Sequence, residues 1–427
     1  RIMGGEAAYI IGAFSTVFGH HADLSFRDLT KAAFNGALSD AALADDHRVD
    51  SVWFGCTGTG GWPRAVNIGQ MCLYPLLGSR QLPGHTPIYN VENACATGSQ
   101  AFQGAVKDIL SGHAELSMAL GVEKIFNPNL DRAGILKSFS GDAPGSGDVH
   151  DAFHAENTAA YDDAKKRFPL SGPEDDRKSV FMDTYAVQAR AHMSLFGTTQ
   201  RQLAASAAKN HRYGCLNDRA QYRFDMSVED VLADRVVSHP LTRAMCAPIS
   251  DGAAAVLVCS ESYLGSLGAT ARERAIRVAA IAFTSGTFRK PEEPGLSRDA
   301  ASRAYADAGI RPEEVDVAEI HDATAFGEIF QSEMLGFCPT GEGGPFVESG
   351  ATGPGGSVPI NTSGGLVSKG HPIAATGLSM LFELARQLRG EAGERQVPDA
   401  SIALQENGGG VMGLEEAACS VCILTRR

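Results

Sequence analysis

The sequence predicts a layered α/β fold that is built from two similar halves. Three observations support this prediction. Short β-rich runs alternate with amphipathic helical stretches, one helix-and-strand pattern occurs twice, and a long polar segment interrupts the first half. Alternating strands and helices favour sheets covered by helical layers, and a repeated pattern favours duplication of a structural unit.

The strands are expected where short apolar runs rich in β-branched and aromatic residues meet turn residues. In the first half these runs are "AYIIGAFS", "VDSVWFGCT", "PIYNVEN", "LSMALGVEK" and "AAAVLVCSE". In the second half they are "IRVAAIAFTSG", "VDVAEIHDA", "VPINTSG", "SIALQENGG" and "CSVCILT". Helical patterns lie between most neighbours, so each half is predicted to hold one five-strand unit.

The repeated pattern joins "LSFRDLTKAAFNGALSDAAL…VDSVWFG" in the first half to "LSRDAASRAYADAGI…VDVAEIH" in the second. Each segment is interpreted as an N-cap serine, an alanine-rich helix and a Val-Asp pair that opens a strand. The segment 126–245 fits neither copy, because it is more charged and is interrupted by Gly and Pro. We therefore predict an N-terminal half of residues 1–125 with 246–270, an inserted loop domain 126–245, and a C-terminal half 271–427.

Composition excludes several classes of protein. A chain of 427 residues with 20% charged and 44% hydrophobic residues is typical of a globular protein of two or three units. The formal net charge of -13 disfavours a nucleic-acid partner, although a local basic patch can still hold an anionic cofactor. No run approaches the ~20 apolar residues of a membrane span, and neither a signal peptide nor a peroxisomal signal is recognised. The odd count of nine cysteines favours reduced thiols and a cytoplasmic location.

Cys95 stands in the segment "ENACATGS", between an apolar run and a helical pattern. A thiol at a helix N-terminus feels the positive end of the helix dipole, so we expect its pKa to lie below the usual ~8.5. Small neighbours leave room for a substrate to approach. The alternative interpretation of this motif alone is a small buried hydrophobic side chain.

Two histidines occupy strand ends and glycine-rich turns. His321 follows a predicted strand in "VAEIHDATAFGEIF", and His371 lies in "PINTSGGLVSKGHPIAATG" just before a helical pattern. A cysteine with histidines at distant points of the chain is the usual arrangement of an activated thiol nucleophile. By contrast, the lone "CSVC" pair of Cys419 and Cys422 is interpreted as strand packing and not as a zinc site.

These segments, together with "CAPISDGAAAVLV" and "ENGGGVMG", follow the order and spacing of the thiolase superfamily, which essentially the whole chain resembles. The segment "FGTTQRQLAASAAKNHRYG" and the histidine that opens the His-Asp motif resemble the sterol-carrier-protein-X type of thiolase. The resemblance implies a thiolase fold, which has five αβαβα layers made of two duplicated halves with an inserted loop domain. It also implies a homodimer or higher oligomer.

The resemblance also implies the roles of the site residues. Cys95 would attack an acyl carbonyl, and His371 would take its proton. His321 would help to hold the thioester oxygen of the second acyl-CoA, directly or through a water. The backbone of Cys95 and of the glycine turn would form the other oxyanion hole, and the expected oxyanion and substrate-binding residues are Asn407, Gly408, Gly410, Ser363 and Gly364.

The chain departs from the family at the second catalytic cysteine. Ordinary thiolases carry it in a Cys-x-Gly motif near the C-terminus, where this chain has Glu406 and Asn407. Many sterol-carrier-type members carry it after His-Asp, where this chain has Ala323. Glu406 is the nearest titratable candidate for the α-carbon acid/base, since a carboxyl in an apolar pocket has a raised pKa. Alternatively Glu406 is structural, and His321 or His371 covers both roles.

The leading hypothesis is a CoA-dependent thiolase that cleaves a 3-oxoacyl-CoA, or runs the reverse Claisen condensation, through an acyl-Cys95 intermediate. The missing cysteines favour a branched, steroidal or aromatic acyl group, with benzoylsuccinyl-CoA as one candidate. An acyltransferase or condensing enzyme with a non-CoA acceptor, a retro-aldolase and a non-catalytic scaffold subunit are the alternatives. The intact set of Cys95, His321 and His371 argues against the scaffold.

Acyl-CoA and coenzyme A are the expected small-molecule partners, with no tightly bound cofactor and no metal. A small zinc-ribbon/OB-fold protein is a further candidate partner, because bacterial relatives of this type often have one. The phosphates of CoA are expected on the inserted region, where the sequence leaves four candidates open: Lys209, Arg212, Arg219 and Arg223.

Overall fold

The structure is a computed structural model, and it describes residues 7–43, 47–60, 62, 66–138, 147–170, 172 and 180–426. The described strands are β1 (Ala8–Ser15), β2 (Ser51–Gly55), β3 (Ile88–Val91), β4 (Leu116–Glu123), β5 (Val236–Ser238), β6 (Leu241–Thr242), β7 (Gly252–Ser260), β8 (Ile276–Ser285), β9 (Val317–Glu319), β10 (Ile402–Gly409) and β11 (Ala418–Arg426). The described helices are α1 (Phe26–Asp40), α2 (Ile68–Leu73), α3 (Thr97–Leu110), α4 (Arg132–Ser138), α5 (Gly147–Arg167), α6 (Val180–Phe196), α7 (Gln200–Cys215), α8 (Val228–Ala233), α9 (Glu261–Ser266), α10 (Ala269–Arg274), α11 (Leu296–Ala308), α12 (Phe326–Met334), α13 (Gly343–Glu348), α14 (Gly365–Lys369) and α15 (Thr376–Arg389).

The nine strands other than β5 and β6 form one sheet in the order β3-β2-β4-β7-β1-β8-β11-β10-β9. The first five strands belong to the first half of the chain and the last four to the second. The two groups meet where β1 pairs with β8 over only two residue pairs. Read outward from this junction, β1-β7-β4-β2-β3 and β8-β11-β10-β9 have the same topology, which is the duplication that the sequence predicts.

The fifth strand of the second half is absent as a regular strand. The segment "VPINTSG" was expected to form it, but Ile360 makes a single isolated parallel bridge to Ala318. Asn361 has a left-handed φ of 57°, and Gly364 and Gly365 continue the turn with φ values of 104° and 60°. The strand prediction for this segment is therefore wrong, because the chain turns away directly after the bridge to build the loop that carries His371.

Helices cover the sheet in layers, as the five-layer prediction requires. Helices α3 and α15 pack between the two halves and share one apolar core with strands of both, including Phe102, Ile109, Leu381 and Leu388. Helix α1 covers the outer face of the first half and α11 covers the outer face of the second. The chain therefore has the αβαβα arrangement with α3 and α15 as the central layer.

The two outer helices begin differently, which corrects one sequence prediction. Ser25 caps α1 in a capping box with Asp28, as expected. In the second half Gly295 is the N-cap of α11, and Ser297 lies inside the helix, where its hydroxyl donates to Gln331 Oε1 at 2.6 Å. Ser297 is thus a buried contact between helices and not a cap.

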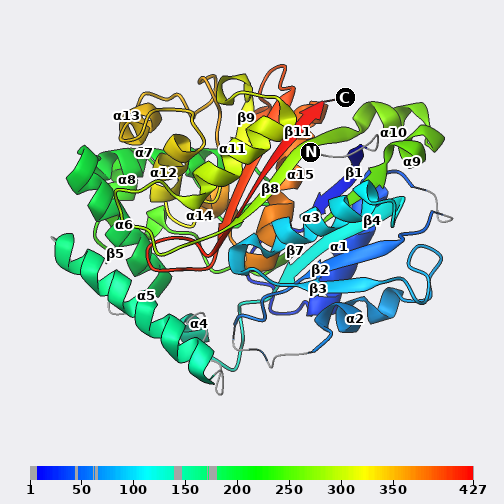
Figure 1. Cartoon of the computed structure of the whole chain (residues 1–427), viewed down its shortest axis with the longest axis horizontal. Helices are drawn as coiled ribbons and strands as arrows, with labels where there is room; N and C mark the ends of the chain where they lie inside the picture. The colour runs from blue at the N-terminus through cyan, green and yellow to red at the C-terminus, as the bar shows by residue number, and fades with distance from the viewer. Residues whose placement is uncertain are drawn as a thin grey trace.

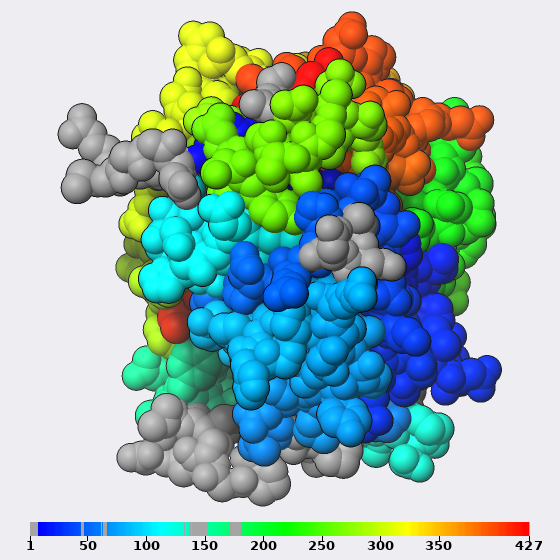
Figure 2. All heavy atoms as spheres, turned by 90° about the vertical axis from the view of Figure 1, so that its right-hand side faces the viewer, coloured from blue at the N-terminus to red at the C-terminus, as the bar shows by residue number. Residues whose placement is uncertain are grey.

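The segment between β4 and β7 holds α4 to α8 and the two-stranded β5–β6 sheet. Figure 1 shows the inserted helices α5 to α8 together on the left of the molecule, beside both halves. Figure 2 shows the opposite side, with the blue and cyan N-terminal half below the lime-green α9 and α10. The boundaries 1–125 with 246–270, 126–245 and 271–427 remain a prediction. Among the described residues, no helix is long and apolar enough to cross a membrane.

One close approach fixes the central layer against the sheet. A Cβ atom at Gly121 in β4 would lie 2.1 Å from the carbonyl oxygen of Ala374, in the turn that leads into α15. This contact is shorter than any real Cβ contact, so only glycine lets the turn after His371 lie on the strand. The position of His371 therefore depends on Gly121.

We predict that Gly121→Ala destabilises the protein by about 1–3 kcal/mol, because the added methyl group forces the Ala374 turn away from β4. Thermal and urea unfolding followed by circular dichroism measure this loss. Gly265→Ala in α9 is the matched control, since no atom lies within 4 Å of its Cβ position. Equal unfolding midpoints for the two variants would contradict the close approach.

Candidate active site

Cys95 lies at the point where β3 hands over to α3, as the sequence predicts. A single 3-10 turn, Ala94–Ala96, joins the two elements. Ala94 has a left-handed φ of 47°, which is uncommon for a residue with a side chain. This strained turn presents the Cys95 side chain to the cavity while α3 runs back into the central layer.

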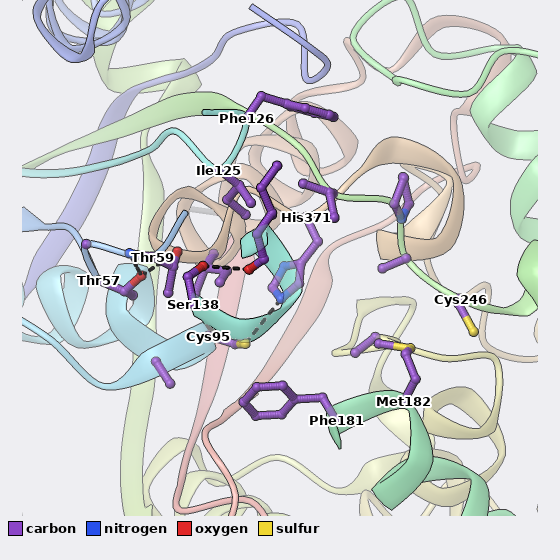
Figure 3. Close-up of a pocket in the computed structure, with 18 of the residues that line it drawn as sticks. Thr57, Thr59, Cys95, Ile125, Phe126, Ser138, Phe181, Met182, Cys246 and His371 are labelled. Carbon is purple, nitrogen blue, oxygen red and sulfur yellow. Dashed lines mark hydrogen bonds between the residues drawn. The ribbon is translucent and has the colours of Figure 1, made fainter. Parts of the chain in front are cut away.

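The thiol of Cys95 faces the imidazole of His371, with Sγ and Nε2 3.1 Å apart (Figure 3). The other ring nitrogen, Nδ1, lies 2.7 Å from Thr376 Oγ1. The Thr376 hydroxyl donates its own proton to Pro372 O at 3.0 Å, so its oxygen must accept from Nδ1. Nε2 of His371 therefore carries the lone pair and accepts the proton of the Cys95 thiol.

His321 lies on the other side of His371, with 5.3 Å between the ring centroids and an edge-on orientation. Its Nδ1 is 3.4 Å from the amide nitrogen of Asn407, and the amide oxygen of Asn407 accepts from Ser99 Oγ at 2.8 Å. The amide nitrogen therefore donates to Nδ1, which leaves the proton of His321 on Nε2. That buried N–H has no partner among the residues that the structure describes, so it is available as a donor.

One ligating atom of each of Cys95, His321 and His371 lies within 4.8 Å of the others. This geometry could hold a metal ion by distance alone. However, the contact with Asn407 assigns the proton of His321 to Nε2, and a protonated nitrogen does not coordinate a metal. The arrangement fits a nucleophile, a base and a hydrogen-bond donor.

Burial controls the charge state of this cluster. Burial lowers the pKa of His321 to about 4, and burial with the neighbouring His321 and Lys369 lowers the pKa of His371 well below its usual value. Burial raises the pKa of the Cys95 thiol to about 12, and Glu416 adds to the effect. The expected low pKa of Cys95 is therefore wrong. Burial and the nearby carboxylates raise this pKa by more than the helix N-terminus lowers it.

The glycine turn 408–410 lies against the nucleophile. The backbone N–H of Gly410 hydrogen bonds to the Cys95 thiol, and Gly410 lines the same cavity. At Gly409 a Cβ atom would lie 2.4 Å from the backbone nitrogen of Ala96, so a side chain cannot be accommodated there. Gly408 fills the equivalent place beside the carboxylate of Glu416, 2.2 Å from its Cβ position.

Glu406 does not point toward the cavity. Successive residues of β10 face opposite sides of the sheet, and Gln405 and Asn407 contact α15 and α3. Glu406 lies on the opposite side, where its carboxylate accepts from the His321 backbone N–H at 2.9 Å and from the Cys419 thiol at 3.3 Å. Burial raises its pKa, as expected, but its contacts indicate that it positions His321.

Ser363 and Gly364 also lie behind the site and are absent from the described lining of the cavity. The backbone N–H and hydroxyl of Ser363 donate to the buried Glu319 at 2.9 and 2.6 Å. A Cβ atom at Gly364 would meet Gly214 of α7 at 2.8 Å. Both residues hold the loop that leads to His371, and we keep their role in substrate binding only as an expectation.

The cavity in front of Cys95 has a volume of about 1350 Å³. It opens between the N-terminal half and the inserted helices, and Figure 3 shows Phe181 and Met182 of α6 across from Cys95, with Phe126 further up. Its lining is mostly apolar, and among the described residues six aromatic ones contribute to it: Phe26, Trp62, Phe126, Phe181, Tyr185 and Tyr222.

The cationic residues that line the large cavity differ from those that the sequence suggested as contacts for the phosphates of CoA. Lys209 pairs with the buried Glu328 at 2.8 Å, and Arg219 stacks on Phe14 and Phe382, so both are occupied in the fold. Arg212 lines a smaller, separate cavity of about 310 Å³. Instead, Arg235 and Arg243 line the large cavity. No sequence motif distinguished these two from the other arginines of the insertion.

Sequence reasoning also missed a tyrosine and a carboxylate. Tyr185 of α6 lines the cavity with Cys95 and packs against the apolar cluster that contains Ala323. Its phenol hydrogen bonds to Glu416, which lies next to the glycine turn. The helix 180–196 carries no local motif, and "GLEEAAC" resembles an ordinary polar turn, so only the fold brings these residues together. The strand-packing interpretation of Cys419 and Cys422 is confirmed, because both are fully buried on β11.

Comparisons with protein families agree with this geometry. Residues 8–230 match the family described as "Thiolase, N-terminal domain", and residues 294–425 match "Thiolase C-terminal domain-like". Together the two matches include the three segments that carry Cys95, His321 and His371, and strands of both halves, while β7 and β8 lie between them.

Curated relatives align along nearly the whole chain. Acetyl-CoA acetyltransferase of Methanothermobacter thermautotrophicus is 34% identical over 411 residues, which cover 95% of this chain and 96% of that relative. Human sterol carrier protein 2 is 34% identical over 435 residues, covering 96% of this chain and 73% of that protein. Benzoylsuccinyl-CoA thiolase subunit BbsB of Thauera aromatica is 32% identical over 407 residues, covering 94% of each chain.

Solved structures show the same fold. The Ltp2-ChsH2(DUF35) aldolase matches with a TM-score of 0.76 at 21% identity, over 100% of this chain and 99% of that chain. Human mitochondrial 3-ketoacyl-CoA thiolase matches with a TM-score of 0.65 at 16% identity, over 99% of each chain. At these identities the likeness concerns the fold.

We predict that Cys95 of the free protein reacts slowly with iodoacetamide at pH 7, because its raised pKa leaves almost no thiolate there. The rate should still increase about tenfold per pH unit from pH 8 to 10, whereas a free thiol levels off above its usual pKa of ~8.5. Peptide mapping after timed labelling measures both rates. The same cysteine in the urea-unfolded chain is the control, and fast labelling of the folded protein that levels off below pH 8 would contradict the raised pKa.

Proposed function

The chain belongs to the thiolase family, and from this premise we propose that it transfers acyl groups to coenzyme A through an acyl-Cys95 intermediate. Its relatives make it an acyltransferase of the thiolase type. The single observation that carries the acyl-enzyme proposal is the contact between Cys95 and His371, in which a base nitrogen with a fixed lone pair faces the thiol at 3.1 Å.

In the proposed reaction, the substrate carbonyl enters beside Cys95 and the thiol transfers its proton to Nε2 of His371. By itself this transfer is unfavourable, because burial disfavours both the thiolate and the imidazolium. It becomes favourable when the thiolate adds to the carbonyl, since the negative charge then moves to the oxygen. Proton transfer and nucleophilic attack are therefore coupled.

Two sets of donors are available for the oxygens that become charged. The unpartnered Nε2–H of His321 supports a role in holding the thioester oxygen of the second acyl-CoA. Asn407 fixes that ring by its contact with Nδ1. The Gly410 N–H, already directed at the thiol, supports a role on the acyl-enzyme side together with the Cys95 backbone. Loss of one such donor typically costs about 10²–10³ in rate.

The size and lining of the cavity support a bulky acyl group. A volume of about 1350 Å³ with six aromatic side chains favours flat or branched hydrophobic substrates over acetoacetyl-CoA alone. We therefore propose a 3-oxoacyl-CoA with an aromatic, branched or steroidal acyl chain, and a benzoylsuccinyl-CoA-like substrate is one member of this class. The reaction is written as thiolysis or as the reverse Claisen condensation.

The mouth of the cavity supplies cations for the phosphates of CoA. Arg235 and Arg243 line it, and Arg243 is exposed and pairs with Asp234 at 2.9 Å. A phosphate group can replace that carboxylate as the acceptor of a guanidinium. We propose these two arginines as CoA phosphate contacts, in place of Lys209 and Arg219.

The alternatives are less well supported. A non-CoA acceptor and a non-catalytic scaffold are not favoured by relatives that are named as acyl-CoA enzymes. A homo-oligomer and a cytoplasmic location stay as proposals. One relative is named as a subunit, which supports our proposal that a small zinc-ribbon/OB-fold partner joins this chain.

We expect a covalent adduct on the wild-type protein, and none on Cys95→Ala, after mixing with a panel of acetyl-, propionyl-, benzoyl- and steroidal acyl-CoA thioesters. Intact-protein mass spectrometry detects the adduct and identifies the acyl class. Free CoA should release it, because thiolysis regenerates the thiol. An adduct that CoA cannot release would contradict CoA as acceptor, and an equal adduct on Cys95→Ala would contradict Cys95 as nucleophile.

We also predict that Arg243→Ala raises the KM for CoA by up to about tenfold with little change in kcat, because a hydrogen bond to a charged group contributes about 1.5 kcal/mol or less at an exposed position. Steady-state kinetics at two salt concentrations measure the effect, which should shrink at high salt. Arg201→Ala is the matched control, since Arg201 is an exposed arginine of the same insertion that pairs with Glu229 at 3.0 Å but does not line the cavity. Equal KM values for the two variants would refute the assignment.

A further inference from the structure

The second acid/base of the reaction is missing from both positions where the family places it. Thiolysis must deliver a proton to the α-carbon of the leaving acyl-CoA, and condensation must remove one. Ala323 lines the cavity and cannot do this, and Glu406 faces the opposite side of the sheet. The inference below rests on the proposed thiolase function and concerns which side chain supplies this group.

Tyr185 lines the same cavity as Ala323, Cys95 and His371. It projects from α6 of the inserted region and packs against the apolar cluster of Ala323, Leu366 and Met380. The ionised forms of Cys95 and Glu416 would both raise the pKa of its phenol, which indicates that it lies close to the nucleophile and to the glycine turn. A phenol is a proton donor and acceptor of suitable length to reach a substrate in this cavity.

Glu416 lies next to the phenol of Tyr185. Its carboxylate accepts a hydrogen bond from Tyr185 and lies beside the α-carbon of Gly408. Two further buried carboxylates, Glu406 and Glu415, are its neighbours, and Arg289 forms its ion pair with Glu415 at 2.6 Å. Within the described part of the chain, neither Glu406 nor Glu416 has an ion-pair partner, so burial raises the pKa of Glu416 and keeps a proton on it.

We propose that Tyr185 is the catalytic acid/base at the substrate α-carbon and that Glu416, hydrogen bonded behind it, stores the proton. The pair replaces the second cysteine of the family with a phenol from the inserted region and a carboxylate from the C-terminal half. The geometry that supports this is the shared cavity of Tyr185, Cys95 and Ala323 and the hydrogen bond between Tyr185 and Glu416.

The protons balance over one thiolysis cycle. In the first half, the Cys95 thiol gives its proton to His371, Cys95 adds to the 3-oxo carbonyl, and the bond between the α- and β-carbons breaks. The electron pair of that bond goes to the α-carbon, which takes the phenol proton of Tyr185, and Glu416 returns a proton to the phenol. The site then holds an acyl-Cys95, a protonated His371 and an ionised Glu416.

In the second half, the thiol of CoA gives its proton to Tyr185 as Tyr185 passes one to Glu416. The CoA thiolate adds to the acyl-enzyme, and the sulfur of Cys95 leaves and recovers its proton from His371. Every group returns to its starting state, and no oxidant or metal is needed. His321 keeps its proton on Nε2 throughout and acts only as a hydrogen-bond donor.

Exchange of the α-hydrogens tests the acid/base role of Tyr185 separately from the nucleophilic role of Cys95. Acetyl-CoA carries α-hydrogens, whereas benzoyl-CoA has none and can only acylate Cys95. In D₂O, the wild-type protein with both thioesters should exchange the acetyl hydrogens for deuterium. Tyr185→Phe should slow this exchange by about 10² or more, while benzoylation of Cys95 stays within about fivefold, since a thiolate leaves without a strong acid. Glu416→Gln should slow exchange in the same selective way.

Proton NMR of acetyl-CoA and intact-protein mass spectrometry provide the two readouts. Tyr213→Phe is the control, because Tyr213 is a buried tyrosine of the same insertion that lies outside the large cavity. Normal exchange in Tyr185→Phe overturns the inference, and so does an equal loss of exchange and benzoylation, which would indicate a purely structural role. Benzoylated wild-type protein without any exchange overturns it too. Wild-type protein that neither thioester acylates would instead count against the proposed function itself.

Discussion

The chemistry of this protein depends on one contact between side chains that are 276 residues apart in the chain, Cys95 and His371. Each residue sits in the turn before a central helix, α3 or α15, and those helices pack together between the two halves of the sheet. The duplicated fold thus brings two equivalent turns face to face. Glycines at the crossing let the turns approach: a Cβ atom at Gly98 of α3 would lie 2.7 Å from Ala374 O, and one at Gly377 of α15 would lie 2.3 Å from Ser99 Oγ.

The same burial that brings these groups together removes their charges. Cys95 and both histidines are predominantly neutral, and the pKa of the nearby Glu123 is also raised by burial, to about 7. A site of this kind does not hold a preformed thiolate. It acts by moving protons along hydrogen bonds whose direction is already fixed, by Thr376 behind His371 and by Asn407 behind His321. Charge separation becomes favourable when the negative charge moves to a substrate oxygen that lies beside preoriented hydrogen-bond donors.

The sequence predicts the fold, the nucleophile and the two histidines, because each depends on local patterns: strand runs, glycine-rich turns and helix starts. It fails where the outcome depends on distant parts of the chain. Burial raises the pKa of Cys95 and carboxylates from other segments add to the effect, so the helix N-terminus predicted a shift in the wrong direction. Glu406 could have been placed correctly, since the alternation of the strand 402–409 puts it on the face opposite Asn407. Tyr185 has no such signal, because an insertion has no repeat to compare it with.

That placement of Tyr185 has a consequence for how this enzyme diverged. In a thiolase with two cysteines, both protons are handled by the duplicated halves, and the insertion only has to hold the substrate. Here α6 carries Tyr185 together with Phe181 and Met182, and all three line the cavity. The helix that shapes the acyl pocket then also delivers the proton. A substrate of different size that displaces α6 therefore also displaces the acid/base, Tyr185. A large, aromatic acyl group would press against α6 and bring the phenol to the α-carbon, whereas a small one would leave it at a distance. Substrate selectivity in this chain would therefore be expressed in the proton-transfer step as well as in binding.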